Sequence, residues 1–153
     1  MTGTPGAAER IRALFRAHLA ARGLRMTRPR ERILEHLLRS RRHQSLDEIH
    51  RALKAHGVGR ATVFRTLRML EECRLLGRLT GTGKAARFEM GAERPHHDHL
   101  LCVDCGRIVE VSWPGLEELQ ARGCRRLGFE PLWHRHEVFG RCASCSKGRS
   151  RHG

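Results

Sequence analysis

The sequence contains no apolar run that approaches the length needed to cross a membrane. Its first residues, Met1 to Glu9, contain no apolar core like that of a secretory signal. Structural disulfides need an oxidising compartment. We therefore expect a cytoplasmic protein with reduced thiols and no membrane partner. Four of its 6 cysteines lie in two close pairs and are then better candidates for metal binding than for disulfide bonds, whereas Cys73 and Cys124 are interpreted as structural or incidental, with redox sensing as the alternative.

Acidic residues are scarce relative to basic ones. The chain has 16 Asp and Glu residues against 30 Lys and Arg residues, which gives a formal net charge of +14. This charge indicates a polyanionic partner, and nucleic acid is a better candidate than an anionic membrane surface because no long basic amphipathic helix stands apart from the fold. Arginine abundance can also reflect genomic base composition, so the charge alone does not establish specific DNA binding.

Metal-ligand residues are concentrated in the segment 96–110, where three histidines and an aspartate precede two cysteines. Cys102 and Cys105 form a C-x2-C pair, and Cys142 and Cys145 form a second one. Two such pairs, separated by a segment long enough to fold, are typical of a closed tetrahedral zinc site, because each pair supplies two thiolates from one tight turn. Disulfides or redox dithiols are the alternatives. The sequence therefore predicts structural Zn2+ at these four cysteines.

The N-terminal half shows helical periodicity, with apolar residues recurring every three or four positions. Ser45 and Glu48 form a capping-box pattern, which predicts a helix start. Helices are expected at 9–22, 28–40, 45–55 and 60–74, and short strands at 78–80 and 86–89. Helices followed by two strands around a glycine-rich turn indicate a winged-helix DNA-binding domain.

The helix expected at 60–74 has two different faces. Val63, Leu67 and Leu70 share the apolar face. The opposite face carries two short hydroxyls and a guanidinium, from Thr62, Arg65 and Thr66. Such a face suits a recognition helix, because hydroxyls allow close approach and a guanidinium reaches phosphate or a guanine edge. A basic solvated helix in an ordinary helical domain is the alternative.

The C-terminal part indicates a small α/β domain, so the predicted fold class is α+β. Strands are expected at 100–103, 107–111 and 134–140, with a helix at 114–127. A domain of roughly 60 residues is near the limit of independent stability, so zinc and a partner subunit are expected stabilisers and a homodimer is favoured. The predicted boundaries are a winged-helix domain at 1–91 with a disordered tail at 1–8, a hinge at 92–95, an α/β dimerisation and metal-binding domain at 96–145, and a loose basic tail at 146–153.

Four motifs follow one another along the chain: RMTRPR at 25–30, ATVFRTL at 61–67, HHDHLLCVDCG at 96–106 and GRC at 140–142. Together they resemble the ferric uptake regulator family of metal-sensing transcriptional repressors. The resemblance implies a dimeric repressor and not an enzyme, with an N-terminal winged helix, a C-terminal dimerisation domain, and metal bound at the hinge between them.

The resemblance also implies roles for individual metal ligands. The structural zinc would be held by Cys102, Cys105, Cys142 and Cys145. The regulatory metal would be held by His43, Glu89, His97 and His99, with Glu110 as a further candidate. An additional metal would be held by His96, Asp98, Glu117 and His134. Alternate residues of an extended segment point to opposite faces, which independently supports separate metals for His97/His99 and for His96/Asp98.

The partner implied by the resemblance is double-stranded DNA with an AT-rich inverted repeat. The DNA-binding candidates are Arg25, Thr62, Phe64, Arg65 and Thr66. Arg25 would reach into a minor groove, and Phe64 and Arg65 would contact bases and phosphates. Phe64 stands where the family usually has tyrosine, so contact with a thymine methyl is kept and a hydroxyl hydrogen bond is lost.

The regulatory donors are imidazoles and carboxylates without sulfur, which suits Fe(II) or Mn(II) better than a zinc-selective thiolate site. Zinc-sensing relatives often carry a cysteine near the position of Glu89, and peroxide-sensing relatives prefer aspartate where Glu89 and Glu110 stand. We therefore expect an Fe(II)-responsive repressor of metal-uptake genes, with zinc, manganese or peroxide sensing as alternatives. Outside the family, a non-sensing zinc-ribbon nucleic-acid binder and a zinc-dependent hydrolase or deaminase are further alternatives.

Overall fold

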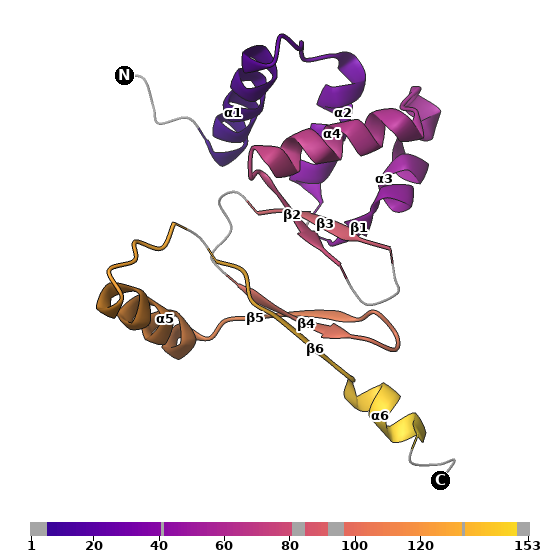
Figure 1. Ribbon diagram of the computed structural model, residues 1–153. Coiled ribbons are helices and arrows are strands. Elements are labelled where there is room, and N and C mark those ends of the chain that lie inside the picture. Colours follow the sequence, from indigo (N-terminus) through magenta and orange to yellow (C-terminus); the bar gives the residue numbers. More distant parts are fainter. Residues whose placement is uncertain (1–5, 41, 81–84, 92–96, 133, 150–153) are drawn as a thin grey trace. The chain divides into compact units, whose positions relative to one another are not determined.

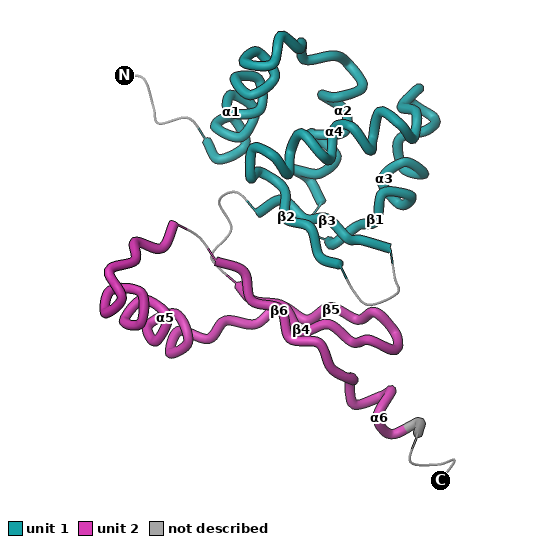
Figure 2. Tube along the Cα trace, viewed as in Figure 1, with its two compact units in different colours: residues 1–80, 85–94 teal, residues 81–84, 95–153 magenta. Residues whose placement is uncertain are grey.

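The computed structural model describes residues 6–40, 42–80, 85–91, 97–132 and 134–149 (Figure 1). The chain forms two compact units (Figure 2). Unit 1 comprises residues 1–80 and 85–94, and unit 2 comprises residues 81–84 and 95–153. The predicted hinge at 92–95 lies outside the described residues. Among those residues, no helix combines the length and the apolarity needed to span a bilayer.

Unit 1 combines helices with a small antiparallel sheet. Its helices are α1 (Ala7–Ala21), α2 (Arg28–Arg39), α3 (Leu46–Leu53) with the 3-10 turn η1 (Lys54–His56), and α4 (Arg60–Glu72). Its strands are β1 (Gln44–Ser45), β2 (Leu76–Leu79) and β3 (Arg87–Met90), in the order β1-β3-β2. One apolar core joins these elements, with Phe15, Ile33, Ile49, Leu67 and Phe88 among its buried members. This is the winged-helix arrangement that the sequence predicts.

The capping box at the start of α3 is present as predicted. The Ser45 hydroxyl oxygen accepts a hydrogen bond from the Glu48 N–H at 3.2 Å, and the Glu48 carboxylate accepts one from the Ser45 N–H at 2.6 Å. The bond from the Ser45 backbone N–H is the main cause that lowers the pKa of Glu48, so this carboxylate stays ionised. The first turn of α3 is thus tied to strand β1.

Both predicted tails are wrong in their described parts. Helix α1 begins at Ala7, not after residue 8, because alanine favours helix and Glu9 places a carboxylate in the first turn, where the helix dipole favours it. Helix α6 (Ala143–Arg149) occupies much of the predicted loose tail. It begins directly after Cys142 and contains Cys145, and the Ser146 N–H donates to the Cys142 carbonyl at 3.0 Å.

Unit 2 is built on a second three-stranded sheet. Its strands are β4 (Asp98–Cys102), β5 (Ile108–Val111) and β6 (Glu137–Gly140), in the order β5-β4-β6. Strand β5 is antiparallel to β4, and β6 is parallel to it. A parallel pair needs a crossover, and the chain between β5 and β6 contains helix α5 (Pro114–Arg126). Strand β6 begins at Glu137, so the strand predicted from 134 is shorter than expected.

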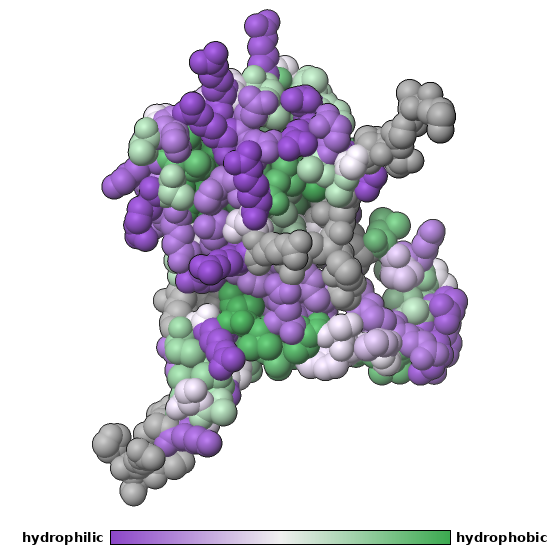
Figure 3. Space-filling view, turned by 180° about the vertical axis from the view of Figure 1, so that it is seen from behind, coloured by the Kyte–Doolittle hydropathy of each residue, from purple (hydrophilic) through white to green (hydrophobic). Residues whose placement is uncertain are grey.

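Unit 2 leaves much apolar surface exposed. Leu101 and Cys102 are its buried hydrophobic residues among those described, and α5 buries none of its side chains. Apolar surface gathers over the sheet of unit 2 in Figure 3. Its exposed large hydrophobic residues are Val109, Trp113, Leu119, Leu127, Phe129, Leu132, Val138 and Phe139. A surface of this kind is typical of a protein interface.

Candidate metal centres and nucleic-acid interface

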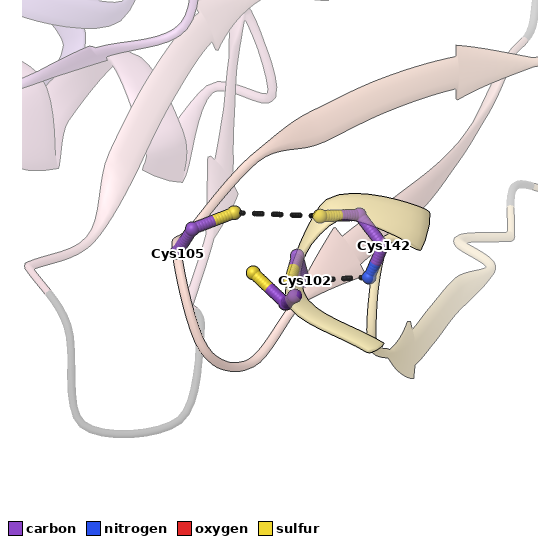
Figure 4. A group of neighbouring side chains, drawn as sticks. Cys102, Cys105 and Cys142 are labelled. Carbon is purple, nitrogen blue, oxygen red and sulfur yellow. Dashed lines mark hydrogen bonds between the residues drawn. The ribbon is translucent and has the colours of Figure 1, made fainter. Parts of the chain in front are cut away.

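Four cysteines of unit 2 come together as the sequence predicts. Their sulfur atoms lie within 4.8 Å of one another, and the sulfurs of Cys105 and Cys142 are 3.7 Å apart. Figure 4 shows side chains of both C-x2-C pairs directed toward one another. Zinc–sulfur bonds of about 2.3 Å in a tetrahedron place neighbouring sulfurs about 3.8 Å apart. The donor set therefore fits a tetrahedral metal, and none of the cysteines forms a disulfide.

The fold brings the two cysteine pairs together through strand pairing. Cys102 ends β4 and lies opposite Gly140 of β6, two residues before Cys142. The turn after Cys102 closes with Gly106 at a φ of 75°, a conformation that favours glycine, and the Gly106 N–H donates to the Cys102 carbonyl at 2.9 Å. The second pair is held against the first because the Cys142 N–H donates to the Cys102 sulfur at 3.3 Å.

These backbone donors also prepare the thiols for metal binding. Hydrogen bonds from the backbone N–H groups of Cys105 and Cys142 lower the pKa of the Cys102 thiol to about 6. The pKa of Cys142 is lowered mainly by a backbone hydrogen bond at Cys145, whereas the side chain of Cys142 raises the pKa of Cys145 to about 12. Thiolate is the ligand form, so Cys102 and Cys142 are poised to coordinate a cation.

Unit 1 contains a pair of donors without sulfur, of which His43 is half-buried and Glu89 is buried. His43 lies just before β1 and Glu89 lies in β3, and the His43 Nε2 and Glu89 Oε2 atoms are 3.1 Å apart. Only 8% of Glu89 is exposed. A buried carboxylate is costly unless it is paired with a cation or a hydrogen-bond donor, and His43 supplies such a partner.

Unit 2 contributes a second pair of imidazoles. His97 and His99 have ring centroids 4.9 Å apart, with His97 just before β4 and His99 within it. His99 is buried. Glu110 of β5 is the strand partner of His99, so its side chain is on the same face of the sheet, where it is exposed. The regulatory ligands predicted from the sequence are thus divided between the units, two from unit 1 and the remainder from unit 2.

Three of the four additional-site candidates also come together in unit 2. Donor atoms of Asp98, Glu117 and His134 lie within 4.8 Å of one another, and the His134 Nε2 and Glu117 Oε1 atoms are 3.0 Å apart. Asp98 is 1% exposed, and its Oδ2 atom is 3.9 Å from Nδ1 of His136. The fourth candidate, His96, lies outside the described residues. His136 is a neighbour that the sequence pattern did not single out as a ligand.

The outer face of α4 is exposed as expected, with one correction. Phe64 is 50% exposed, Arg65 is exposed, and Thr62 is half-buried. Thr66 was predicted to face DNA, but it is 0% exposed and its hydroxyl donates to the Thr62 carbonyl at 2.7 Å. That bond satisfies the hydroxyl inside the helix, so Thr66 can pack in the core with the apolar residues. Arg25, between α1 and α2, is exposed.

A sequence model of the ferric uptake regulator family matches residues 21–139. The chain belongs to the ferric uptake regulator family. The ferric uptake regulation protein of Bordetella parapertussis is 40% identical to it over 131 residues, which cover 83% of this chain and 93% of the relative. The peroxide operon regulator of Bacillus subtilis is 37% identical over 127 residues, which cover 82% of this chain and 86% of the relative.

A solved structure agrees with this assignment. The ferric uptake regulator Fur of Helicobacter pylori, whose structure reveals three functional metal binding sites, matches with a TM-score of 0.77. The two proteins are 28% identical, and the match covers 92% of this chain and 95% of the other. The predicted fold class and the predicted family are confirmed.

Membership in the ferric uptake regulator family also defines the broad activity. The protein is a metal-responsive, DNA-binding transcriptional repressor that acts as a homodimer, as expected from the sequence. Relatives named for ferric uptake and for peroxide response both match most of the chain. Both kinds of signal therefore occur among the relatives of this repressor.

Proposed function

We propose that Fe(II) controls this repressor by joining its two units. The observation that carries the proposal is the division of the sulfur-free donors, with His43 and Glu89 in unit 1 and His97 and His99 in unit 2. One ion held by both pairs would stabilise only an arrangement of the units in which the pairs meet. By linkage, metal and DNA then favour the same arrangement, and a coupling of about 1–3 kcal/mol raises DNA affinity roughly 5–150-fold.

The chemistry of the donors supports Fe(II) or Mn(II) as the regulatory ion. Imidazole nitrogens and carboxylate oxygens suit these ions, and the sulfur donors of unit 2 are gathered in a separate cluster. Glu89 and Glu110 are glutamates, whereas the resemblance associates peroxide sensing with aspartate at these positions. We therefore assign Fe(II) as the regulatory ion. Manganese, zinc and peroxide sensing are the alternative outcomes of the test below.

We assign structural Zn2+ to the four cysteines, and the homodimer to unit 2. The small core of unit 2 supports both assignments, because such a domain needs a metal or a partner subunit to be stable. The additional site would use Asp98, Glu117 and His134, with His96 as the fourth candidate. A homodimer with two-fold symmetry reads an inverted repeat, and an AT-rich repeat suits insertion of Arg25 into a narrow minor groove.

The direct test is anaerobic fluorescence anisotropy with zinc-loaded protein and an AT-rich inverted-repeat duplex. A scrambled duplex and competitor DNA at stated salt control for nonspecific binding, which a charge of +14 makes strong. Specific binding that appears with Fe(II) supports the proposal, and specific binding that appears with Mn(II) but not with Fe(II) would indicate a manganese sensor. A response to submicromolar Zn(II) alone would indicate a zinc sensor, and release by hydrogen peroxide would indicate a peroxide sensor.

Variants separate sensing from folding in the same assay. His97→Ala combined with His99→Ala should keep the structural zinc but lose the response to Fe(II). His18→Gln, which changes a histidine of α1 outside the donor pairs, is the matched control and should respond normally. DNA binding that is specific but indifferent to metal in every variant would show that the protein is a non-sensing nucleic-acid binder.

A further inference from the structure

Arg87 lies at the point where the sheet of unit 1 meets the start of α3. It is in β3, two residues before Glu89, and it is the strand partner of Ser45 in β1. Its Nη1 atom donates to the His43 carbonyl at 2.9 Å and to the Glu48 carboxylate at 3.0 Å. One guanidinium therefore holds the backbone of one regulatory-ligand candidate and the capping residue of a helix.

The contact with His43 matters because regular strand pairing does not reach that residue. Strand β1 has two residues, and its pairs with β3 are Gln44 with Phe88 and Ser45 with Arg87. His43 stands just before the strand. The hydrogen bond from Arg87 extends the connection to the His43 carbonyl, while the imidazole of the same residue lies 3.1 Å from Glu89.

The contact with Glu48 continues toward the DNA-binding helix. Glu48 is in the first turn of α3 and also accepts the Ser45 N–H at 2.6 Å. The neighbouring residue Asp47 pairs with Arg60, the first residue of α4, at 2.8 Å. Helix α3 packs directly against α4. Polar contacts thus join the His43 backbone through Arg87 to Glu48, and the next residue in the same helix turn, Asp47, joins α3 to the N-terminus of the predicted recognition helix.

We propose that Arg87 is a positioning residue for the regulatory metal, which fixes His43 beside Glu89 and ties this half of the site to the first turn of α3. The inference rests on the proposed function. Groups that orient metal ligands typically change metal affinity about 10–100-fold when they are lost. Arg87 acts through His43 and Glu48 and need not touch the ion.

The test measures Mn(II) binding to zinc-loaded protein by electron paramagnetic resonance of free Mn(II), and Mn(II)-dependent DNA binding by anisotropy. The Mn(II)-binding sites that are lost in His43→Ala protein are identified as the regulatory class of sites. Arg87→Met should weaken Mn(II) binding in this class about 10–100-fold. It should also raise the Mn(II) concentration needed for DNA binding by the same factor. Arg87→Lys, which keeps one charged donor, should restore part of the affinity.

Arg12→Met is the matched control. Arg12 joins α1 to α2 through Glu35 at 2.7 Å, with similar exposure, and so tests the loss of an arginine–glutamate pair in the same unit. It should leave Mn(II) affinity unchanged. Zinc content and circular dichroism check the fold of each variant. If Arg87→Met does not fold, Arg87→Lys is used for the test instead, and its Mn(II) affinity should lie between that of the wild type and the about 10–100-fold loss expected for a missing positioning group.

Each other outcome overturns the inference in a distinguishable way. Normal Mn(II) affinity in folded Arg87→Met would show that Arg87 has no positioning role, while the proposed function stands. An equal loss in Arg12→Met would show that the effect is general destabilisation. A wild-type protein without any Mn(II) site sensitive to His43→Ala would overturn the proposed function and this inference together.

Discussion

Loss of one zinc ligand should unfold unit 2 and leave unit 1 folded. Cys102→Ser tests this, because Cys102 ends β4 and accepts the hydrogen bond that holds the second cysteine pair. The two units are stabilised differently. Unit 1 has a core that joins its helices to its sheet, around residues such as Phe15, Leu67 and Leu70. In unit 2, the described hydrophobic residues that are buried are Leu101 and Cys102.

The magnitudes decide the outcome. Burial of a leucine side chain contributes about 1.5–3 kcal/mol, so Leu101 cannot hold unit 2 by itself. A structural zinc site contributes about 10–16 kcal/mol in small domains. That range equals or exceeds the roughly 5–15 kcal/mol by which whole domains are stable. Without a complete zinc site, unit 2 should therefore lose its sheet, and the homodimer that depends on unit 2 should dissociate.

The assay combines zinc analysis, light scattering after size exclusion, and hydrogen exchange followed by mass spectrometry. Peptides from β4 and β5 should exchange fully in Cys102→Ser, while peptides from α1 and α4 keep their protection. Cys124→Ser is the matched control, since Cys124 lies in α5 of the same unit but outside the cysteine cluster. Retained protection of β4 in zinc-free, monomeric Cys102→Ser would refute the reasoning.

Three further outcomes are expected. Arg65→Ala should weaken specific DNA binding by about 1–3 kcal/mol if Arg65 reads a base, or should lower the slope of log affinity against log salt by about 1 if Arg65 contacts phosphate. Thr66→Ala should instead lower the free energy of unfolding. Anisotropy at several salt concentrations measures the first effect, and urea titrations measure the second. Single His97→Ala protein should bind zinc normally but lose most of the roughly 5–150-fold Fe(II) response, and a normal response would exclude His97 as a ligand. Glu48→Ala should cost about 1 kcal/mol of stability at pH 7. The folded-state pKa of Glu48 is lowered from 4.5. The contribution of Glu48 to the free energy of unfolding is therefore fully present above pH 4.5 and is lost as the pH falls through the folded-state pKa. Urea titrations should then show the stabilities of the wild type and Glu48→Ala converging at acidic pH.

Local sequence signals predicted the local structure well. The reciprocal pattern of Ser45 and Glu48 predicted the start of α3, and the helix predicted at 28–40 is present as α2, from Arg28 to Arg39. These features depend on neighbours within one turn, so the sequence contains all the information they need. The family resemblance rested on motifs of the same local kind, and it is confirmed.

Predictions failed where a residue's surroundings outweighed its type. Thr66 is polar, and a helical wheel placed it with Thr62, but its hydroxyl bonds within the helix and the residue is buried. The segment 146–153 was predicted to be a loose basic tail, yet helix α6, which begins at Ala143 within the second cysteine pair, continues to Arg149. Neither outcome can be read from composition, because each depends on which groups are packed nearby.

The sequence alone determined which atoms are available: the sulfur donors in two pairs, the alternating His97, Asp98 and His99, and the excess of basic side chains. The tertiary structure decided which of them meet. Parallel pairing of β4 with β6 brings Cys142 to Cys102 across 40 residues of chain, and pairing of β1 with β3 allows Arg87 to hold the His43 backbone. Contacts between distant segments depend on strand order and register, which are set by the packing of the whole unit and not by any short stretch of sequence.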